Sequence, residues 1–377
     1  MFQRFEQALA QAIAKGRIAG GVALIADRDG VVYEHAAGVR AAGEAAAMDA
    51  ATVFWIASMT KAVTSVAALQ LVERGKLTLD GDLADLIPEF RDLQVLTEGG
   101  GLRPAKGPVT LRQLLTHTSG FAYGFSSPEL GAWMEASGVE TNTGSRASYR
   151  YPLLFDPGEG WIYGIGIDWA GLAIEAASGQ RLDAWFRENI FAPLGMTDTG
   201  FERSPDRTAG VHVRGPDGGL MQIPFGMPPN AEVLSGGGGL YSTARDYGRF
   251  LRMLLNGGEL DGARILSAAT VRGLSAIQTG ERRAGYIKSA MANLSNDFDL
   301  YPQMATGHGL ATMVTPQATA EGRGAGSLAW GGLANTYYWA DPAAGKAGVL
   351  LTQLLPFGDP EILALFRALE RDAYGTA

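Results

Sequence analysis

The sequence predicts an α/β fold of the α+β type, in which helices flank a sheet built from both ends of the chain. Three observations lead to this prediction. The 377 residues exceed the size at which one core keeps growing, so two lobes are expected. Strand-like runs gather in residues 1–80 and 231–377, whereas residues 81–230 hold short helices and many Gly- and Pro-containing loops. We therefore expect a sheet domain from the two ends and a mainly helical lobe inserted over residues 81–230.

The first eighty residues predict a helix, two strands and a second helix. An apolar stripe at helical spacing marks residues 1–20: Phe2, Phe5, Leu9 and Ile13. Residues 21–26 and 31–35 are apolar runs of strand length, and Arg28-Asp29-Gly30 between them indicates a hairpin. Residues 52–56 predict a strand or tight turn that leads into an apolar helix ending at Gly75.

The remaining elements follow from the same signals. In the middle of the chain we expect helices over 110–116, 167–178 and 181–191, with Thr110 as the cap of the first. Four consecutive glycines, 236–239, come next. No lysine follows them, which favours a close backbone approach or a hinge over a phosphate cradle. The last part predicts a helix over 243–256, strands over 308–314, 326–330, 335–341 and 346–354, and a helix over 360–372.

Composition excludes several classes of function. The net charge of −8 is modest and no block of like charge occurs, so neither nucleic acid nor an anionic membrane is expected as a partner. The absence of cysteine excludes disulfides, thiolate catalysis and cysteine-ligated metals. The N-terminal stretch lacks the apolar centre of a signal peptide and no run suits a transmembrane helix, so a cytoplasmic location is expected. The oligomeric state has no signal in the sequence.

Ser58-Met59-Thr60-Lys61 is the strongest chemical signal in the chain. Ser58 stands at the start of the predicted helix, where free N–H groups and the helix dipole stabilise negative charge. Lys61 lies one turn further on the same face, where its amine can activate the hydroxyl or accept its proton. An N-cap serine followed by a solvated lysine would have the same sequence.

Other serine and metal chemistries find less support. No serine has glycine at both −2 and +2, which disfavours a nucleophile-elbow hydrolase. The four histidines are widely spread, so a metal site is not expected. His117 is the best candidate for a Ser-His-Asp triad, although a helix-end histidine bonded to loop backbone explains it better.

Two further segments suit a Ser–Lys site. Tyr163 follows a Gly-rich loop and precedes an apolar helix, and a nearby ammonium would bring its phenol toward proton transfer at working pH. Trp330-Gly331-Gly332-Leu333 ends a predicted strand, and its glycines allow substrate to lie against backbone. The N–H groups of Leu333 and Ser58 are the candidate oxyanion hole. The alternatives are an ordinary core or surface position for Tyr163, and a strand-edge tryptophan followed by a glycine turn for Trp330.

These motifs, in this order, resemble the serine β-lactamase and penicillin-binding-protein superfamily over residues 5 to 360. The resemblance is strongest to class C β-lactamase-like esterases, the family VIII carboxylesterases. Besides the Ser58 motif and Trp330-Gly331-Gly332, it rests on Leu114-Leu115-Thr116-His117-Thr118-Ser119-Gly120, Pro157-Gly158-Glu159 through Tyr163, Pro193-Leu194-Gly195-Met196 and residues 236–243. It implies the antiparallel sheet and inserted lobe of the serine β-lactamase/DD-peptidase fold.

The resemblance implies an acyl-enzyme on Ser58, with Lys61 and Tyr163 as the proton-transfer pair and no cofactor or metal. Two departures favour neutral esters over β-lactams: Ile165 replaces the asparagine of Tyr-x-Asn, and Trp330 replaces the lysine of Lys-Thr-Gly. With Gly331 and Gly332 these residues form the expected substrate-binding wall, which suits a small-molecule ester with a short acyl chain. A β-lactamase or D-Ala-D-Ala peptidase, with its carboxylate anchor at an arginine of 281–288, and an acyltransferase of the same fold are the alternatives.

Overall fold

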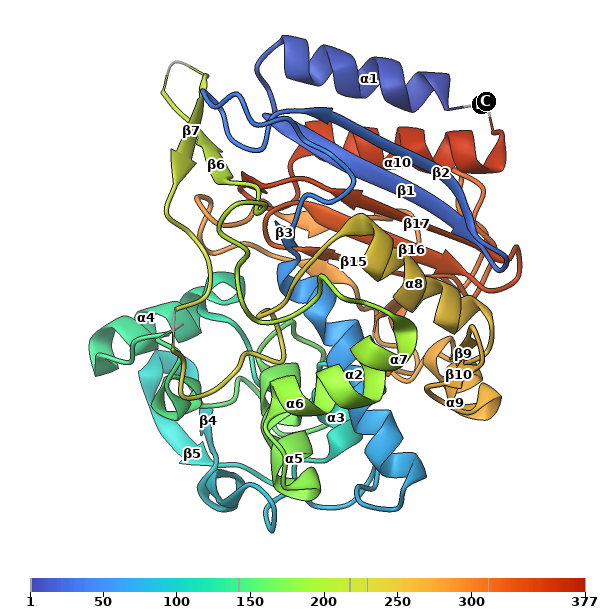
Figure 1. Cartoon of the computed structure of the whole chain (residues 1–377). Coiled ribbons are helices and arrows are strands. Elements are labelled where there is room, and N and C mark those ends of the chain that lie inside the picture. Colours follow the sequence, from blue (N-terminus) through green and yellow to red (C-terminus); the bar gives the residue numbers. More distant parts are fainter. Residues whose placement is uncertain (1, 142, 217, 229, 311, 377) are drawn as a thin grey trace.

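A seven-stranded antiparallel sheet forms one side of the molecule, and the two chain ends supply all of its strands (Figure 1). The computed structural model describes residues 2–141, 143–216, 218–228, 230–310 and 312–376. Across the sheet the strands run in the order β13 (Gly307–His308), β14 (Met313–Val314), β15 (Leu328–Gly332), β16 (Thr336–Asp341), β17 (Lys346–Leu351), β1 (Gly20–Asp27) and β2 (Val31–Gly38). The predicted fold class is confirmed, because the first and last segments of the chain meet where β1 pairs with β17.

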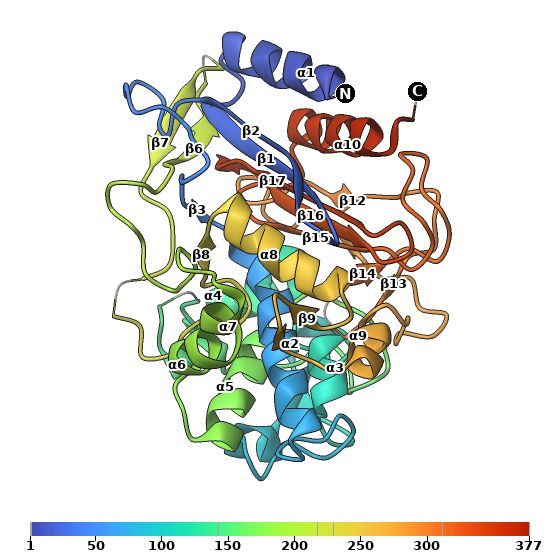
Figure 2. The same ribbon diagram turned by 45° about the vertical axis from the view of Figure 1, so that its right-hand side comes forward.

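Helices cover both faces of this sheet (Figure 2). Helices α1 (Gln3–Ala14) and α10 (Pro360–Tyr374) lie side by side on one face, and the backbone N–H of Phe5 donates to the Asp372 carboxylate at 2.9 Å. Helix α8 (Ala244–Leu255) packs on β1 and β17 from the other face. Strand β1 is buried along nearly all its length, which explains its continuous apolar run.

The mainly helical half surrounds α2 (Thr60–Glu73), the helix that follows Ser58. Twelve of its residues are buried, so it is apolar on every side rather than amphipathic. It packs against α5 (Gly166–Ser178). Around this pair lie α3 (Leu111–Leu115), which Thr110 caps as predicted, and α4 (Pro128–Ser137), α6 (Leu182–Phe186), α7 (Ala192–Leu194) and α9 (Ala268–Leu274).

Short strand pairs complete the described structure. They are β3 (Phe54–Trp55) with β8 (Tyr241–Ser242), β4 (Gln94–Leu96) with β5 (Leu102–Pro104), β9 (Glu259–Leu260) with β10 (Ala263–Arg264), and β11 (Tyr286–Ile287) with β12 (Phe298–Asp299). A three-stranded sheet joins β18 (Leu354–Leu355), β6 (Val211–Arg214) and β7 (Leu220–Ile223). Segment 211–223 therefore lies beside the C-terminal part of the chain, and the predicted domain boundaries stay predictions.

Three predicted elements differ in detail. The run 308–314 is a hairpin rather than one strand, because the Gly309 N–H closes a turn onto the Thr312 carbonyl at 2.9 Å. The run 346–354 divides into β17 and β18, which belong to different sheets. The run 181–191 begins as α6 and continues as a π-helical turn over Arg187–Phe191. Among the described residues, no helix combines the length and apolar character needed to cross a membrane.

Candidate active site

Ser58 lies in a single 3₁₀ turn, Ala57–Met59, between β3 and the buried helix α2. Ala57 has a φ of +44°, a left-handed conformation that is strained for a residue with a side chain. The turn brings Ser58 to the wall of a cleft, where it is partly exposed. The predicted position of Ser58 near a helix start is thus confirmed, with the 3₁₀ turn placed directly before the helix.

Lys61 is buried beneath Ser58 and its amine contacts three oxygens. Nζ lies 3.2 Å from Ser58 Oγ, 3.0 Å from the Tyr123 hydroxyl and 2.6 Å from the Gly237 carbonyl oxygen. Each of these oxygens can accept a hydrogen bond from Nζ. The amine therefore faces the Ser58 hydroxyl directly and is held in place by Gly237 and Tyr123.

Tyr163 also lies beside the Lys61 amine, but its hydroxyl bonds to a different residue. Lys61 Nζ is 4.8 Å from the centre of the Tyr163 ring. The Tyr163 hydroxyl accepts a hydrogen bond from Trp330 Nε1 at 3.3 Å. The structure therefore brings the three predicted catalytic residues together, with the Tyr163 phenol held by Trp330 rather than by Lys61.

Tyr123 is the residue of this cluster that sequence reasoning missed. Its hydroxyl accepts from Lys61 and donates to Asp168 Oδ2 at 3.2 Å. Burial and the nearby Asp168 charge hold the pKa of Tyr123 well above its usual range. The only signal for it in the sequence is its position three residues after Gly120, where the family-like segment 114–120 ends. The chain has 12 tyrosines, so this signal did not single out Tyr123 as the phenol beside Lys61.

Asp168 connects the glycine run to the lysine. This buried carboxylate at the start of α5 accepts from Ser235 Oγ at 2.6 Å and from the Gly237 N–H at 2.9 Å. Gly237 thus binds Asp168 through its N–H and Lys61 through its carbonyl. A Cβ on Gly237 would lie 2.2 Å from Asp168 Oδ2, so the predicted close backbone approach is confirmed.

The segment Trp330-Gly331-Gly332-Leu333 lies on the opposite wall, at the end of β15. A Cβ on Gly332 would lie 2.2 Å from the Ile56 carbonyl oxygen, so β15 touches the backbone that leads into Ser58. Leu333 and Ser58 both line the cleft, as do Trp330, Gly331 and Ile165. Gly332 is absent from that lining, since it faces the Ile56 backbone.

His117 plays the structural part that the sequence favoured. The Gly164 N–H points at its Nδ1 over 3.4 Å, and its ring contacts those of Tyr163 and His308. Burial, with the neighbouring His308 and Lys61, holds the pKa of His117 well below its usual range. Burial likewise lowers the pKa of His308 to about 4. Both imidazoles are therefore neutral, and they pack against the rings of Tyr163 and Trp330.

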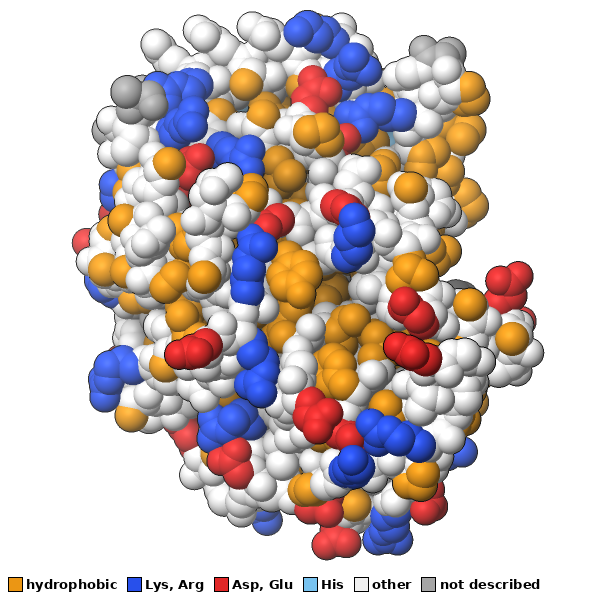
Figure 3. Space-filling model, turned by 180° about the vertical axis from the view of Figure 1, so that it is seen from behind, with side chains coloured by type: hydrophobic (Ala, Val, Ile, Leu, Met, Phe, Trp, Pro, Cys, Tyr) orange, Lys and Arg blue, Asp and Glu red, His pale blue; other side chains and the backbone are white. Residues whose placement is uncertain are grey.

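The cleft between these walls has a volume of about 410 Å³ and a mostly apolar lining. Figure 3 shows hydrophobic side chains gathered in a hollow between the upper and lower halves of the molecule. Aromatic and Met side chains dominate the lining, including Tyr123, Phe125, Met134, Tyr149, Tyr151, Phe225, Met227, Met291 and Phe357. Asp168 is the one charged residue among the described lining residues, so the cleft suits a neutral substrate. Over the described residues, no group of three or more His, Asp or Glu side chains could hold a metal ion.

Comparison with known proteins identifies the family. A sequence model described as Beta-lactamase matches residues 5–372, almost the whole chain. The chain belongs to the beta-lactamase family. Its predicted relationship to serine β-lactamases and penicillin-binding proteins is thereby confirmed.

Relatives of this chain include proteins named as esterases and acyltransferases. The chain is 34% identical to a lovastatin esterase of Penicillium rubens, over 96% of each protein. It is 32% identical to acyltransferase calJ of Penicillium decumbens, over 85% of this chain and 80% of the relative. A mutant simvastatin synthase (LovD) from Aspergillus terreus superimposes with a TM-score of 0.84 at 30% identity, covering 98% of this chain and 94% of the other. EstCE1, a hydrolase with promiscuous acyltransferase activity, superimposes with a TM-score of 0.78 at 25% identity, covering 99% of this chain and 97% of the other. This beta-lactamase-family chain therefore shares its fold with hydrolases and acyltransferases.

Proposed function

We propose that the protein is a carboxylesterase that cleaves short-chain carboxylic esters through an acyl-enzyme on Ser58. The contact of 3.2 Å between Lys61 Nζ and Ser58 Oγ, at the wall of an apolar cleft, carries this proposal. A buried lysine whose amine faces a serine hydroxyl can take the hydroxyl proton as the oxygen attacks.

In the proposed reaction, Ser58 Oγ attacks the ester carbonyl and its proton passes to the Lys61–Tyr163 pair. The ester C–O bond then breaks, and the same proton leaves with the alcohol. Water repeats the sequence on the acyl-enzyme and releases the acid. The N–H groups of Ser58 and Leu333 hold the oxyanion, while Trp330, Gly331 and Ile165 form the wall against which the ester lies. Gly332, which was expected in this wall, lies against the Ile56 backbone instead.

Tyr123 is a second candidate for the phenol of this proton relay. The 3.0 Å contact between its hydroxyl and Lys61 Nζ favours Tyr123 as the group that orients the amine. Tyr163, whose ring stacks on the same amine, is proposed to meet the leaving group from the Trp330 side of the cleft. Separate tyrosine variants distinguish the two roles.

Acyl transfer to an alcohol is the second candidate function. It uses the same acyl-enzyme, and it is favoured by relatives named as acyltransferases, such as monacolin J acid methylbutanoyltransferase of Aspergillus terreus at 32% identity. A β-lactamase or D-Ala-D-Ala peptidase has less support. Neither Arg282 nor Arg283 is among the residues that line the cleft, and Arg283 pairs with Asp299. A small-molecule substrate, no nucleic-acid or membrane partner and a cytoplasmic location complete the proposal.

Initial rates on p-nitrophenyl acetate, butyrate and octanoate, compared with nitrocefin, test the hydrolase. Adding a primary alcohol and measuring the new ester against the free acid separates hydrolysis from transfer. A protein that turns over none of the three esters would contradict the proposal.

A further inference from the structure

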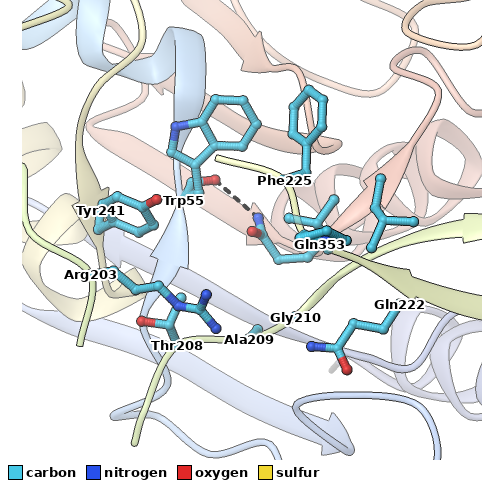
Figure 4. Close-up of a pocket in the computed structure, with 12 residues that line it drawn as sticks. Trp55, Arg203, Thr208, Ala209, Gly210, Gln222, Phe225, Tyr241 and Gln353 are labelled. Carbon is cyan, nitrogen blue, oxygen red and sulfur yellow. Dashed lines mark hydrogen bonds between the residues drawn. The ribbon is translucent and has the colours of Figure 1, made fainter. Parts of the chain in front are cut away.

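A second pocket of about 330 Å³ lies behind one wall of the active-site cleft (Figure 4). Two side chains, Trp55 and Phe225, line both cavities, and their ring centroids are 5.6 Å apart. Trp55 precedes the proposed nucleophile by three residues. The partition between cleft and pocket therefore includes two side chains, close to Ser58 along the chain.

The two side chains of this partition, Trp55 and Phe225, differ in burial and in the number of hydrogen bonds that hold them. Trp55 is 6% exposed, its Nε1 donates to the Gly238 carbonyl at 2.8 Å, and its own carbonyl accepts from Gln353 Nε2 at 3.0 Å. Phe225 is 37% exposed and follows the end of β7. Exposed side chains change rotamer within nanoseconds, so Phe225 is the half that can swing aside.

The chemistry of the pocket differs from that of the cleft. Arg203 is the one cation among the described residues that line the pocket. The other lining side chains include apolar ones, Val211, Ile223, Pro224 and Tyr241, and polar ones, Thr208, Gln222 and Gln353. Within the described part of the chain Arg203 forms no ion pair. Figure 4 shows Arg203 and Gln353 on opposite sides of the pocket.

Gln353 adds a second polar feature. The residue is 5% exposed, and its amide oxygen has no hydrogen-bond donor among the described residues. A buried acceptor without a partner costs free energy unless water or a ligand supplies the donor. An ionised carboxylate has no donor for this oxygen, so an anionic group would sit on the Arg203 side of the pocket, and water is left as the partner of Gln353.

We propose that this pocket receives the far end of the substrate's acyl group when that group is an apolar chain ending in a carboxylate. The inference rests on the proposed function, since the ester must react at Ser58, and extends it from short-chain acyl groups to longer ones with a terminal charge. The acyl chain of the substrate passes Phe225, and its methylene groups lie against apolar residues such as Val211 and Ile223. Its carboxylate pairs with Arg203. Hydrolysis of such a hemi-ester releases a dicarboxylic acid and the alcohol.

Matched esters test this subsite. The probes are p-nitrophenyl octanoate and mono-p-nitrophenyl suberate, which have acyl chains of equal length and differ in the terminal carboxylate. In Arg203→Gln we expect the ratio of kcat/KM for suberate to that for octanoate to fall about fivefold. Arg203→Lys retains most of the ratio, and Arg272→Gln, which removes an exposed arginine outside the pocket, leaves it unchanged. An unchanged ratio in Arg203→Gln would overturn the proposal.

The partition has its own test. Phe225→Ala should raise kcat/KM for octanoate relative to acetate about fivefold, whereas Met221→Ala, an exposed apolar residue on β7, should not. An unchanged chain-length profile in Phe225→Ala would contradict a path past this ring.

A binding measurement separates this inference from the proposed function. Titration calorimetry of Ser58→Ala with monomethyl suberate should give a Kd about fivefold tighter than the same titration with Ser58→Ala/Arg203→Gln. Equal values would refute the subsite even if all esters are hydrolysed. Wild-type protein without activity on p-nitrophenyl acetate would refute the proposed function, and the calorimetric difference would still decide the subsite.

Discussion

At the scale of single residues, the proposal depends first on Ser58. Ser58→Ala should lower kcat on p-nitrophenyl butyrate by at least about 10⁴, because the covalent step loses its nucleophile. The free energy of unfolding should change by about 1 kcal/mol at most, since one hydroxyl at a helix start is lost. Intact mass after a fluorophosphonate probe should show one adduct, located in the peptide with Ser58. An adduct on another serine would refute the assignment.

The two tyrosines beside Lys61 make separable contributions. Tyr163→Phe and Tyr123→Phe should each lower kcat, and a residue that transfers a proton directly should cost about 10² to 10⁴. The double variant should cost much less than the product of the two losses, because residues that act as a unit are not additive. Steady-state kinetics of the three proteins measure this. If Tyr163→Phe keeps the wild-type kcat, Tyr163 does not transfer the proton. Tyr123 would then be the tyrosine that works with Lys61.

Asp168 accepts hydrogen bonds from the Gly237 N–H and the Tyr123 hydroxyl, two residues that also contact the Lys61 amine. Asp168→Asn replaces one accepting oxygen by an NH₂ group, so at least one of these bonds is lost and kcat on p-nitrophenyl butyrate should fall by at least about tenfold. Tyr149→Phe, which removes only a bond of 3.4 Å to the same carboxylate, is the control that should keep kcat within about twofold of wild type. Wild-type kcat in Asp168→Asn would contradict a positioning role for this carboxylate.

At the scale of elements, the glycine run 236–239 joins α2 to α5 through one residue, Gly237. Gly237→Ala should remove most activity and reduce the free energy of unfolding by about 1–3 kcal/mol, because its Cβ would collide with the Asp168 carboxylate. Gly238→Ala is the matched control. The nearest atom to a Cβ there is Ser235 Oγ at 3.7 Å, so thermal unfolding of this variant should stay close to wild type.

At the scale of the whole molecule, we expect the apolar cleft between the two halves to determine specificity. We expect kcat/KM for short-chain neutral esters to exceed that for nitrocefin or benzylpenicillin by at least about 10³, which corresponds to roughly 4 kcal/mol. Trp330 places an indole where the resemblance expects a lysine, and a β-lactam carboxylate would be desolvated there without a partner. Trp330→Lys should narrow the gap. Greater efficiency on a β-lactam in the wild-type protein would show that the carboxylate has another anchor.

The sequence by itself determined the fold class and placed strands at both chain ends, because hydrophobic periodicity and turn residues are local signals. Ser58 and Lys61 are neighbours along one helix turn, so their contact follows from helix geometry. The Thr110 cap, the apolar helix α2 and the close backbone approach of the glycine run were predictable for the same reason.

Only the tertiary structure decided which phenol meets Lys61, because that depends on where two loops far apart in sequence come to rest. Tyr123 and Asp168 come from separate segments, and no spacing relates either of them to Ser58 or to the glycine run. The division of 308–314 into a hairpin and the pocket behind Trp55 likewise depend on contacts between distant segments. Hydrogen bonds across a core are selected by packing in three dimensions, and a linear pattern of residue types does not record them.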